Sequence, residues 1–243
     1  MKGHMYNIAR SRLCRIVLSV ATMFAIVMVA PLALADGGGN VMPANANPHG
    51  YSLDDMTLKL ALFQTSGNQP QYYPQTPFQI LYTDPNKPPT VSDLACPDLG
   101  QGILVTNHNS FVVPFGTPFF VPLWSVDDSP PIIPPFPVQS SMAGYYFFDP
   151  QGVGGRDFEV IVDGQIAKLG PPYVGGPVTA PLLNGGSHMV LLGAFITPMS
   201  VGTHTVTIKG TLAGAGILQY YDLHCIGEDI TYFVRVVPGK SGK

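Results

Sequence analysis

Residues 158–169 read FEVIVDGQIAKL, and this stretch decides the fold class. Phe158 and the valines and isoleucine after it are residue types that favour strands. Asp163-Gly164 is a preferred two-residue hairpin turn, and apolar residues return directly after it. The stretch therefore predicts a β-hairpin.

Short apolar runs separated by turn residues lie on both sides of this hairpin. In residues 203–209 polar and apolar side chains alternate, which places Val206 and Ile208 on one inner face. Many short strands with turns between them are typical of a sandwich or barrel. We therefore expect a mainly β protein, an antiparallel β-sandwich of immunoglobulin-like or jelly-roll-like type with one short N-terminal helix. Further strands are predicted at 78–82, 102–106, 111–113, 119–123, 189–196 and 231–237.

The helix is predicted to begin after Ser52. Ser52 with an acid three residues later, Asp55, matches the capping-box pattern. Apolar residues then recur at spacings of three, four and three, and Gly67 offers a stop. Such a stripe packs on its own domain more often than on a partner. The stripe consists of Leu53, Met56, Leu60 and Phe63.

The segment 114–137 is rich in proline, which removes ladder hydrogen bonds and forbids a helix. We expect an extended loop with at most one edge strand. Because aromatic residues are interleaved with the prolines, the loop is expected to lie against the domain.

The first 35 residues have the pattern of a secretory signal: a basic stretch, an apolar run over 16–30 and Ala33-Leu34-Ala35. The alternative is a membrane anchor that extends the apolar run through 31–35. Cleavage after Ala35 leaves no membrane span. The prediction is a secreted protein, periplasmic or extracellular.

The sequence predicts four regions: a signal peptide at 1–35, a flexible leader at 36–50, a single β-sandwich domain at 51–238 and a frayed tail at 239–243. The chain has 12 Lys and Arg against 15 Asp and Glu. The signal carries four of the bases and no acid, so 8 bases, 15 acids and a net charge of −7 remain. Because no basic cluster remains, nucleic acid is not an expected partner.

Two cysteines remain after cleavage, Cys96 and Cys225. In an oxidising compartment two cysteines are expected to pair. The alternative, a metal site that uses His224 beside Cys225, supplies too few ligands for the usual zinc spacings. We therefore expect a disulfide.

Aromatic residues in turn-rich places are the candidate binding residues, because a flat ring can stack on a sugar or a protein surface. The alternative is that adjacent aromatics hold the layers of the sandwich together. The candidates are Trp124, Phe120, Tyr146 and Tyr221.

Asp127 and Asp128 precede a rigid Ser-Pro-Pro turn and are the candidate metal ligands, with calcium as the implied ion. The alternative is that one of them caps the turn. Together with Asp157, they are also the candidate acids of a hydrolase.

The catalytic patterns that we tested are incomplete: a G-x-S-x-G elbow, an H-E-x-x-H metal motif and a phosphate loop. We therefore expect a secreted non-catalytic binding or structural protein of the cell envelope or extracellular space. The expected partner is a polysaccharide or another protein of that compartment. The alternative function is a secreted hydrolase that acts through loop carboxylates, with calcium as its cofactor.

Overall fold

Two mixed β-sheets make up most of the computed structural model, which describes residues 40–96 and 100–239. The protein is mainly β, as predicted, with a few helices. The predicted signal peptide lies outside the described residues, as do 36–39 of the leader and 240–243 of the tail.

The four-stranded sheet has the order β1-β4-β8-β7. Its strands β4 and β8 are antiparallel, whereas β1 is parallel to β4. β8 reads as a continuous apolar run because both of its faces are buried. The strands are β1 (Gln79–Ile80), β4 (Phe119–Asp127), β7 (Val174–Thr179) and β8 (His188–Ile196).

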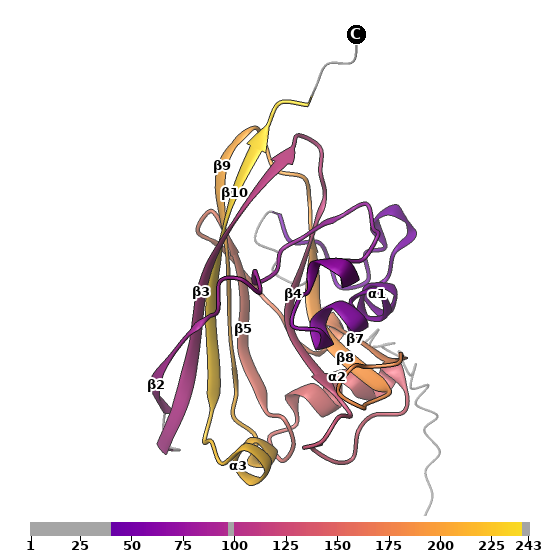
Figure 1. Ribbon diagram of the computed structural model, residues 1–243, viewed down its shortest axis with the longest axis vertical. Helices are drawn as coiled ribbons and strands as arrows, with labels where there is room; N and C mark the ends of the chain where they lie inside the picture. Colours follow the sequence, from indigo (N-terminus) through magenta and orange to yellow (C-terminus); the bar gives the residue numbers. More distant parts are fainter. Residues whose placement is uncertain (1–39, 97–99, 240–243) are drawn as a thin grey trace, which may run out of the picture. The chain divides into compact units, whose positions relative to one another are not determined.

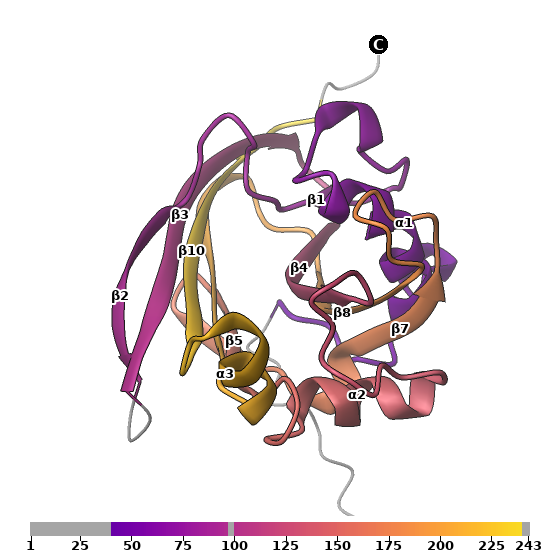
Figure 2. The ribbon, with the colours of Figure 1, turned by 60° about the horizontal axis from the view of Figure 1, so that its bottom comes forward.

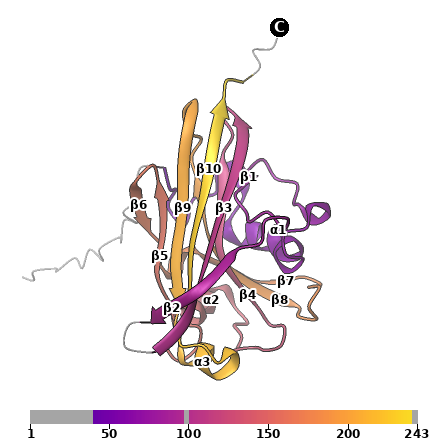
Figure 3. The same cartoon turned by 60° about the vertical axis from the view of Figure 1, so that its left-hand side comes forward.

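The six-stranded sheet has the order β2-β3-β10-β9-β5-β6. Figure 3 shows β9, β10 and β3 running side by side along its centre. β3 and β10 are parallel, so the prediction of a purely antiparallel sandwich is wrong in both sheets. The strands are β2 (Thr90–Cys96), β3 (Gly100–Pro114), β5 (Gly155–Val162), β6 (Gln165–Lys168), β9 (Gly202–Leu212) and β10 (Ile226–Val237).

One hydrophobic core is shared by the inner faces of the two sheets, which face each other in Figures 1 and 2. Val121 and Leu192 come from the four-stranded sheet, and Val160 and Ile208 come from the six-stranded sheet. Val206 and Ile208 are both buried, which confirms the predicted phase of β9. Burial of these apolar side chains is the main source of stability for such a pair of sheets.

The predicted helix is α1 (Leu53–Thr65). Ser52 Oγ accepts a hydrogen bond from Asp55 N, and Asp55 Oδ2 accepts one from Ser52 N, so the capping box is complete. All four residues of the predicted stripe are buried. They pack on Ile80, Phe120, Leu191 and Phe195 of the four-stranded sheet, on its face away from the core shared with the other sheet.

Two further helices correct the prediction of a single helix. α2 (Ser140–Phe148) and α3 (Ala215–Tyr221) lie at the same end of the two sheets (Figures 1 and 2). The strands β2 and β7 were also not predicted.

The proline-rich segment contains β4, which pairs with β8 along its length but with β1 only at Phe119 and Phe120, so beyond Phe120 it has a strand partner on one side only. Pro122 is accommodated because the β4–β8 register shifts between Pro122 and Trp124. The loop interpretation holds for residues 115–118, which precede β4, and for the part of the segment that follows β4.

The predicted disulfide is confirmed: Cys96 and Cys225 are bonded, with their Cα atoms 5.9 Å apart. Gly102 lies beside it, and a Cβ there would be 2.5 Å from Cys96 Sγ, so only glycine fits. The bond joins the end of β2 to the residue before β10.

The described part of the leader contacts the domain. Val41 pairs with Ile196, and Tyr173 donates a hydrogen bond to the Met42 carbonyl oxygen. In the described part of the chain, no helix combines the length and apolar character that a membrane crossing requires.

Candidate functional site

The loop after β4 and the turn before β8 are tied together by a group of polar residues that we call the Asp128 clamp: Asp128, Ser129, Gly186, Ser187 and His188. The β4–β8 ladder ends with Asp127 opposite Met189, so continuing it by one residue brings Asp128 opposite His188. Asp128 N donates to the His188 carbonyl oxygen at 3.1 Å. The clamp therefore extends the pairing of two central strands into their loops.

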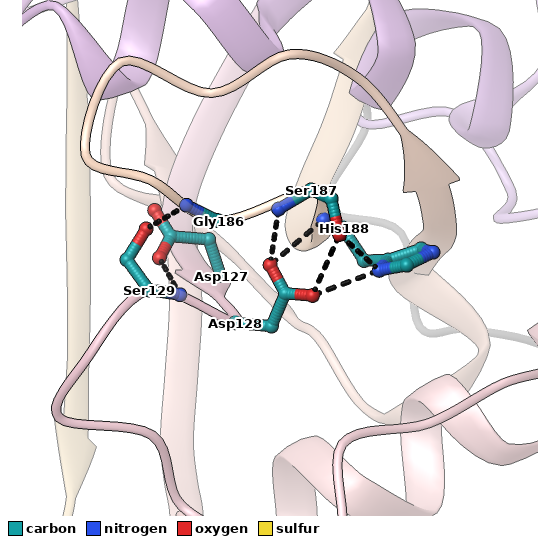
Figure 4. Close-up of polar contacts among 6 residues, drawn as sticks. All are labelled: Asp127, Asp128, Ser129, Gly186, Ser187 and His188. Atoms are coloured by element: carbon teal, nitrogen blue, oxygen red, sulfur yellow. Dashed lines mark hydrogen bonds and ion pairs between the residues drawn. The ribbon is translucent and has the colours of Figure 1, made fainter.

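The Asp128 carboxylate is the centre of the clamp, and Figure 4 shows it facing Ser187 and His188. Its Oδ1 accepts hydrogen bonds from the backbone nitrogens of Ser187 at 2.6 Å and His188 at 2.8 Å. Its Oδ2 lies 3.2 Å from Ser187 Oγ and 2.8 Å from His188 Nδ1. Ser129 Oγ accepts a further bond from Gly186 N at 3.0 Å.

The hydrogen bonds of the clamp favour the ionised form of Asp128. Burial opposes ionisation, but the bonds from the backbone and side chains of His188 and Ser187 together outweigh it and lower the pKa to about 2. The carboxylate is therefore charged at neutral pH. It serves as an acceptor that fixes the two loops.

Asp128, His188 and Ser187 are the residue types of a hydrolytic triad, but their geometry differs from one. A triad uses both ring nitrogens of the histidine, one toward the acid and the other toward the serine. Here Asp128 Oδ2 and Ser187 Oγ both approach His188 Nδ1, at 2.8 and 2.9 Å. With the carboxylate ionised, Nδ1 carries the proton and cannot accept one from Ser187.

Gly186 allows the two loops to approach this closely. A Cβ at this position would lie 2.6 Å from Asp128 Oδ1 and 2.6 Å from Ser129 Oγ. Any side chain would therefore push the loops apart.

A cavity of about 220 Å³ lies beside the clamp, which we call the inter-sheet cavity. Its walls come from β4 in one sheet, from β9 and β10 in the other, and from α3. Trp124 and Tyr221 are its aromatic residues, and Ser125, Asp127 and Ser129 are its polar ones. The apolar walls are Val126, Ile133, Val153, Leu212, Ile217 and Ile226.

Asp127 is held in place by the same loop. Its Oδ1 accepts a hydrogen bond from Ser129 N at 2.8 Å, and Ser129 is a member of the clamp. Tyr221 is fixed from the other side, because its hydroxyl donates to the Pro131 carbonyl oxygen at 3.3 Å. Burial and, after it, the Asp127 carboxylate raise the pKa of Tyr221, and both residues line the same cavity.

Three of the sequence candidates, Trp124, Tyr221 and Asp127, thus meet at one cavity. The other two aromatic candidates, Phe120 and Tyr146, are buried and present no ring to a ligand at the surface. Phe120 is fully buried beneath α1 and contacts Phe195. Tyr146 is buried in α2, with its hydroxyl donating to the Ile133 carbonyl oxygen at 2.9 Å. Tyr146 therefore supports the loop behind the cavity.

The candidate acids are divided between two places. Asp157 lies on β5 in a separate groove with Glu159, Lys209 and Asp229, where Lys209 Nζ is 3.0 Å from Asp229 Oδ2. Among the described residues, Asp157 and Asp127 line different hollows and do not form a pair of acids. Within residues 40–96 and 100–239, no three His, Cys, Asp or Glu side chains gather as metal ligands, so the calcium role of Asp127 and Asp128 stays a prediction.

Sequence reasoning missed Ser187 and His188, which lie about 60 positions from Asp128 along the chain. A usable signal was present: pairing the two predicted strands 119–123 and 189–196 antiparallel brings the residues after the first strand near those before the second. The cavity residue Ile217 was missed because α3 was not predicted.

Comparison of the chain with family models, curated proteins and solved structures finds no match in any of the three.

Proposed function

We propose that the protein is a secreted, non-catalytic binding protein of the cell envelope or extracellular space, and that its ligand occupies the inter-sheet cavity. One observation carries the proposal. Trp124 and Asp127 from β4, and Tyr221 from α3 far along the chain, line one partly apolar cavity beside the Asp128 clamp. An apolar cavity with a few fixed polar groups is the usual form of a ligand site.

The clamp supports binding rather than catalysis. Both carboxylate oxygens of Asp128 already accept hydrogen bonds. The ring nitrogen of His188 that faces the Ser187 hydroxyl carries a proton, so it cannot act as the base that would activate this serine. Asp127 is the one carboxylate among the described residues of the cavity wall, whereas glycoside hydrolysis commonly uses a pair. The hydrolase alternative therefore receives no support from this geometry.

The size of the cavity favours a small ligand. Sites for drug-sized molecules enclose roughly 300 to 1,000 Å³, and this one encloses about 220 Å³. A polysaccharide, the partner class expected from the sequence, would enter by one terminal unit. A protein partner would enter by one side chain.

The localisation and the fold type belong to the same proposal. The Cys96–Cys225 disulfide is consistent with an oxidising compartment. The two facing sheets with a shared core support a β-sandwich. The immunoglobulin-like and jelly-roll-like types stay predictions, because the parallel pairs β1–β4 and β3–β10 depart from a purely antiparallel arrangement.

The test is a thermal-shift screen of residues 36–243 against soluble sugars, small organic ions and calcium, since a ligand of the folded state raises the melting temperature. The variant Tyr221→Ala removes one wall of the cavity, and Tyr145→Ala is its matched control because Tyr145 is 72% exposed on α2. A hit that survives Tyr145→Ala and is lost in Tyr221→Ala supports the proposal. Hits that are equally strong in both variants contradict it.

A further inference from the structure

We infer that the ligand of the inter-sheet cavity is a small organic cation, a substituted ammonium group on a compact apolar body. The inference rests on the proposed function and names the chemistry of the same cavity. It is carried by the charge of the wall, by the aromatic rings and by the apolar surface between them.

The charge of the cavity wall is uncompensated. Asp127 is its carboxylate, and none of the described residues that line it is a lysine, arginine or histidine. The ion pairs formed within the described residues are His188–Asp128, His204–Asp163 and Lys209–Asp229, and Asp127 takes part in none of them. A half-buried carboxylate without a counter-charge attracts a cation into the space beside it.

The potential of Asp127 reaches the aromatic part of the wall. The pKa of Tyr221 is raised first by burial, which disfavours the charged phenolate, and then by the Asp127 carboxylate, which repels a second negative charge. An anionic ligand would meet the same opposition. The cavity therefore selects against anions as well as for cations.

The aromatic rings suit the same ligand. The faces of tryptophan and tyrosine attract cations, and tryptophan does so most strongly. Trp124 is held in position by an edge-to-face contact with Phe158, with ring centroids 6.5 Å apart and an interplanar angle of 76°. The apolar walls around the rings suit methyl or methylene groups better than hydroxyls.

The size of the cavity admits either a sugar unit or a small organic cation, and the polar groups of the wall distinguish between them. A sugar ring would also stack on Trp124, but its hydroxyls need several hydrogen-bond partners. The side-chain partners that the wall offers are those of Ser125, Asp127 and Ser129, the Tyr221 hydroxyl, which already donates to the Pro131 carbonyl oxygen, and the Trp124 indole N–H, which can only donate. An alkylammonium ion needs the charge and the rings, both of which are present.

The test compares choline with 3,3-dimethylbutan-1-ol, its neutral isostere, by calorimetric titration into residues 36–243. Choline is expected to bind at least about tenfold more tightly, because only it gains the charge and cation–π contributions. Asp127→Asn is expected to weaken choline by about the same factor and to leave the neutral isostere unchanged. Asn keeps the acceptor for Ser129 N, so the loop is retained.

The matched control is Asp149→Asn, since Asp149 Oδ1 accepts an equivalent bond from Gln151 N at 3.0 Å but lies outside the cavity wall. Far-UV circular dichroism establishes that both variants fold. Equal binding of choline and the isostere, or binding of sugars without choline, would overturn the cation inference and leave the proposed function standing. Failure of every compound in the screen would remove both.

Discussion

Asp128 Oδ2 lies 2.8 Å from His188 Nδ1, and this contact joins the end of β4 to the beginning of β8. Asp128 directly follows β4 and His188 begins β8, and these two strands are adjacent in the four-stranded sheet. The contact therefore holds one wall of the inter-sheet cavity, including Asp127, at a fixed place.

Asp128→Asn is expected to lower the stability of the protein by about 2 kcal/mol at pH 7, the free energy that corresponds to a carboxyl pKa lowered from 3.8 to about 2. Because the folded pKa is depressed, this contribution is present above pH 4 and is lost as the pH falls toward 2. Urea unfolding at pH 7 and at pH 2.5 measures it. Asp149→Asn serves as the control, and a loss that is as large at pH 2.5 as at pH 7 would contradict the assignment.

The pair Asp163–His204 is expected to make stability depend on pH near neutrality. His204 Nδ1 lies 2.6 Å from Asp163 Oδ2, and this hydrogen bond, against the effect of burial, raises the pKa of His204. A raised histidine pKa contributes stability that is complete below pH 6.5 and is lost as the pH rises through the folded value.

Asp163→Asn tests this pair, because Asn tolerates the left-handed φ of 49° and keeps the bond from Thr205 N. The melting temperatures of the parent and the variant are expected to differ more at pH 6 than at pH 9. The same difference at both pH values would show that the histidine charge plays no part.

Glu228 is buried on β10, and its Oε1 has no hydrogen-bond partner within the described residues. Burial raises its pKa well above the usual value of 4.5, so folding retains a proton that the unfolded chain releases. Stability is therefore lost as the pH rises above 4.5. Glu228→Gln is expected to melt at a higher temperature than the parent, by a margin that grows between pH 4 and pH 8.

Scanning calorimetry across this pH range measures this difference in melting temperature, with Glu159→Gln as the control, because Glu159 is a half-buried glutamate that lines the same groove as Glu228. If the difference in melting temperature between Glu228→Gln and the parent stays constant or shrinks with rising pH, ionisation of the buried Glu228 does not destabilise the fold.

Cys96→Ser is expected to destabilise the protein by about 4 to 5 kcal/mol, because the bond closes a loop of 129 residues. For a chain of this length the melting temperature should fall by roughly 10 °C or more. The parent protein with its disulfide reduced should have the same melting temperature as Cys96→Ser. If the reduced and oxidised parent melt together, the bond contributes nothing to stability.

Local patterns in the sequence were sufficient for α1, the hairpin β5–β6 and the central strands β8 to β10, because capping, turn chemistry and strand alternation act over a few residues. α2 was missed because its adjacent tyrosines and phenylalanines favour strands in isolation. Burial of Ala143, Tyr146 and Phe147, at helical spacings of three and four, decides the outcome. That spacing was present in the sequence.

Some residues of the site could be predicted from the sequence, but their arrangement around one cavity could not. Trp124, Asp127 and Tyr221 were identified by residue type, but their meeting at one cavity depends on how two sheets and α3 pack. The prolines predict an edge strand because they disrupt ladders; β1 pairs only with the first two residues of β4, and the register shift beside Pro122 interrupts the ladder to β8. The parallel pairing of β3 with β10 joins segments that no local pattern connects.

The most direct test of the central claim uses the fluorescence of Trp124, which is the sole tryptophan of the chain and lines the cavity. Titration of residues 36–243 with choline should change its emission in a saturable manner, with the same dissociation constant as calorimetry, and Asp127→Asn should abolish the change at those concentrations. If choline binds by calorimetry while the emission of Trp124 stays constant, the ligand lies elsewhere and the inter-sheet cavity is not the binding site.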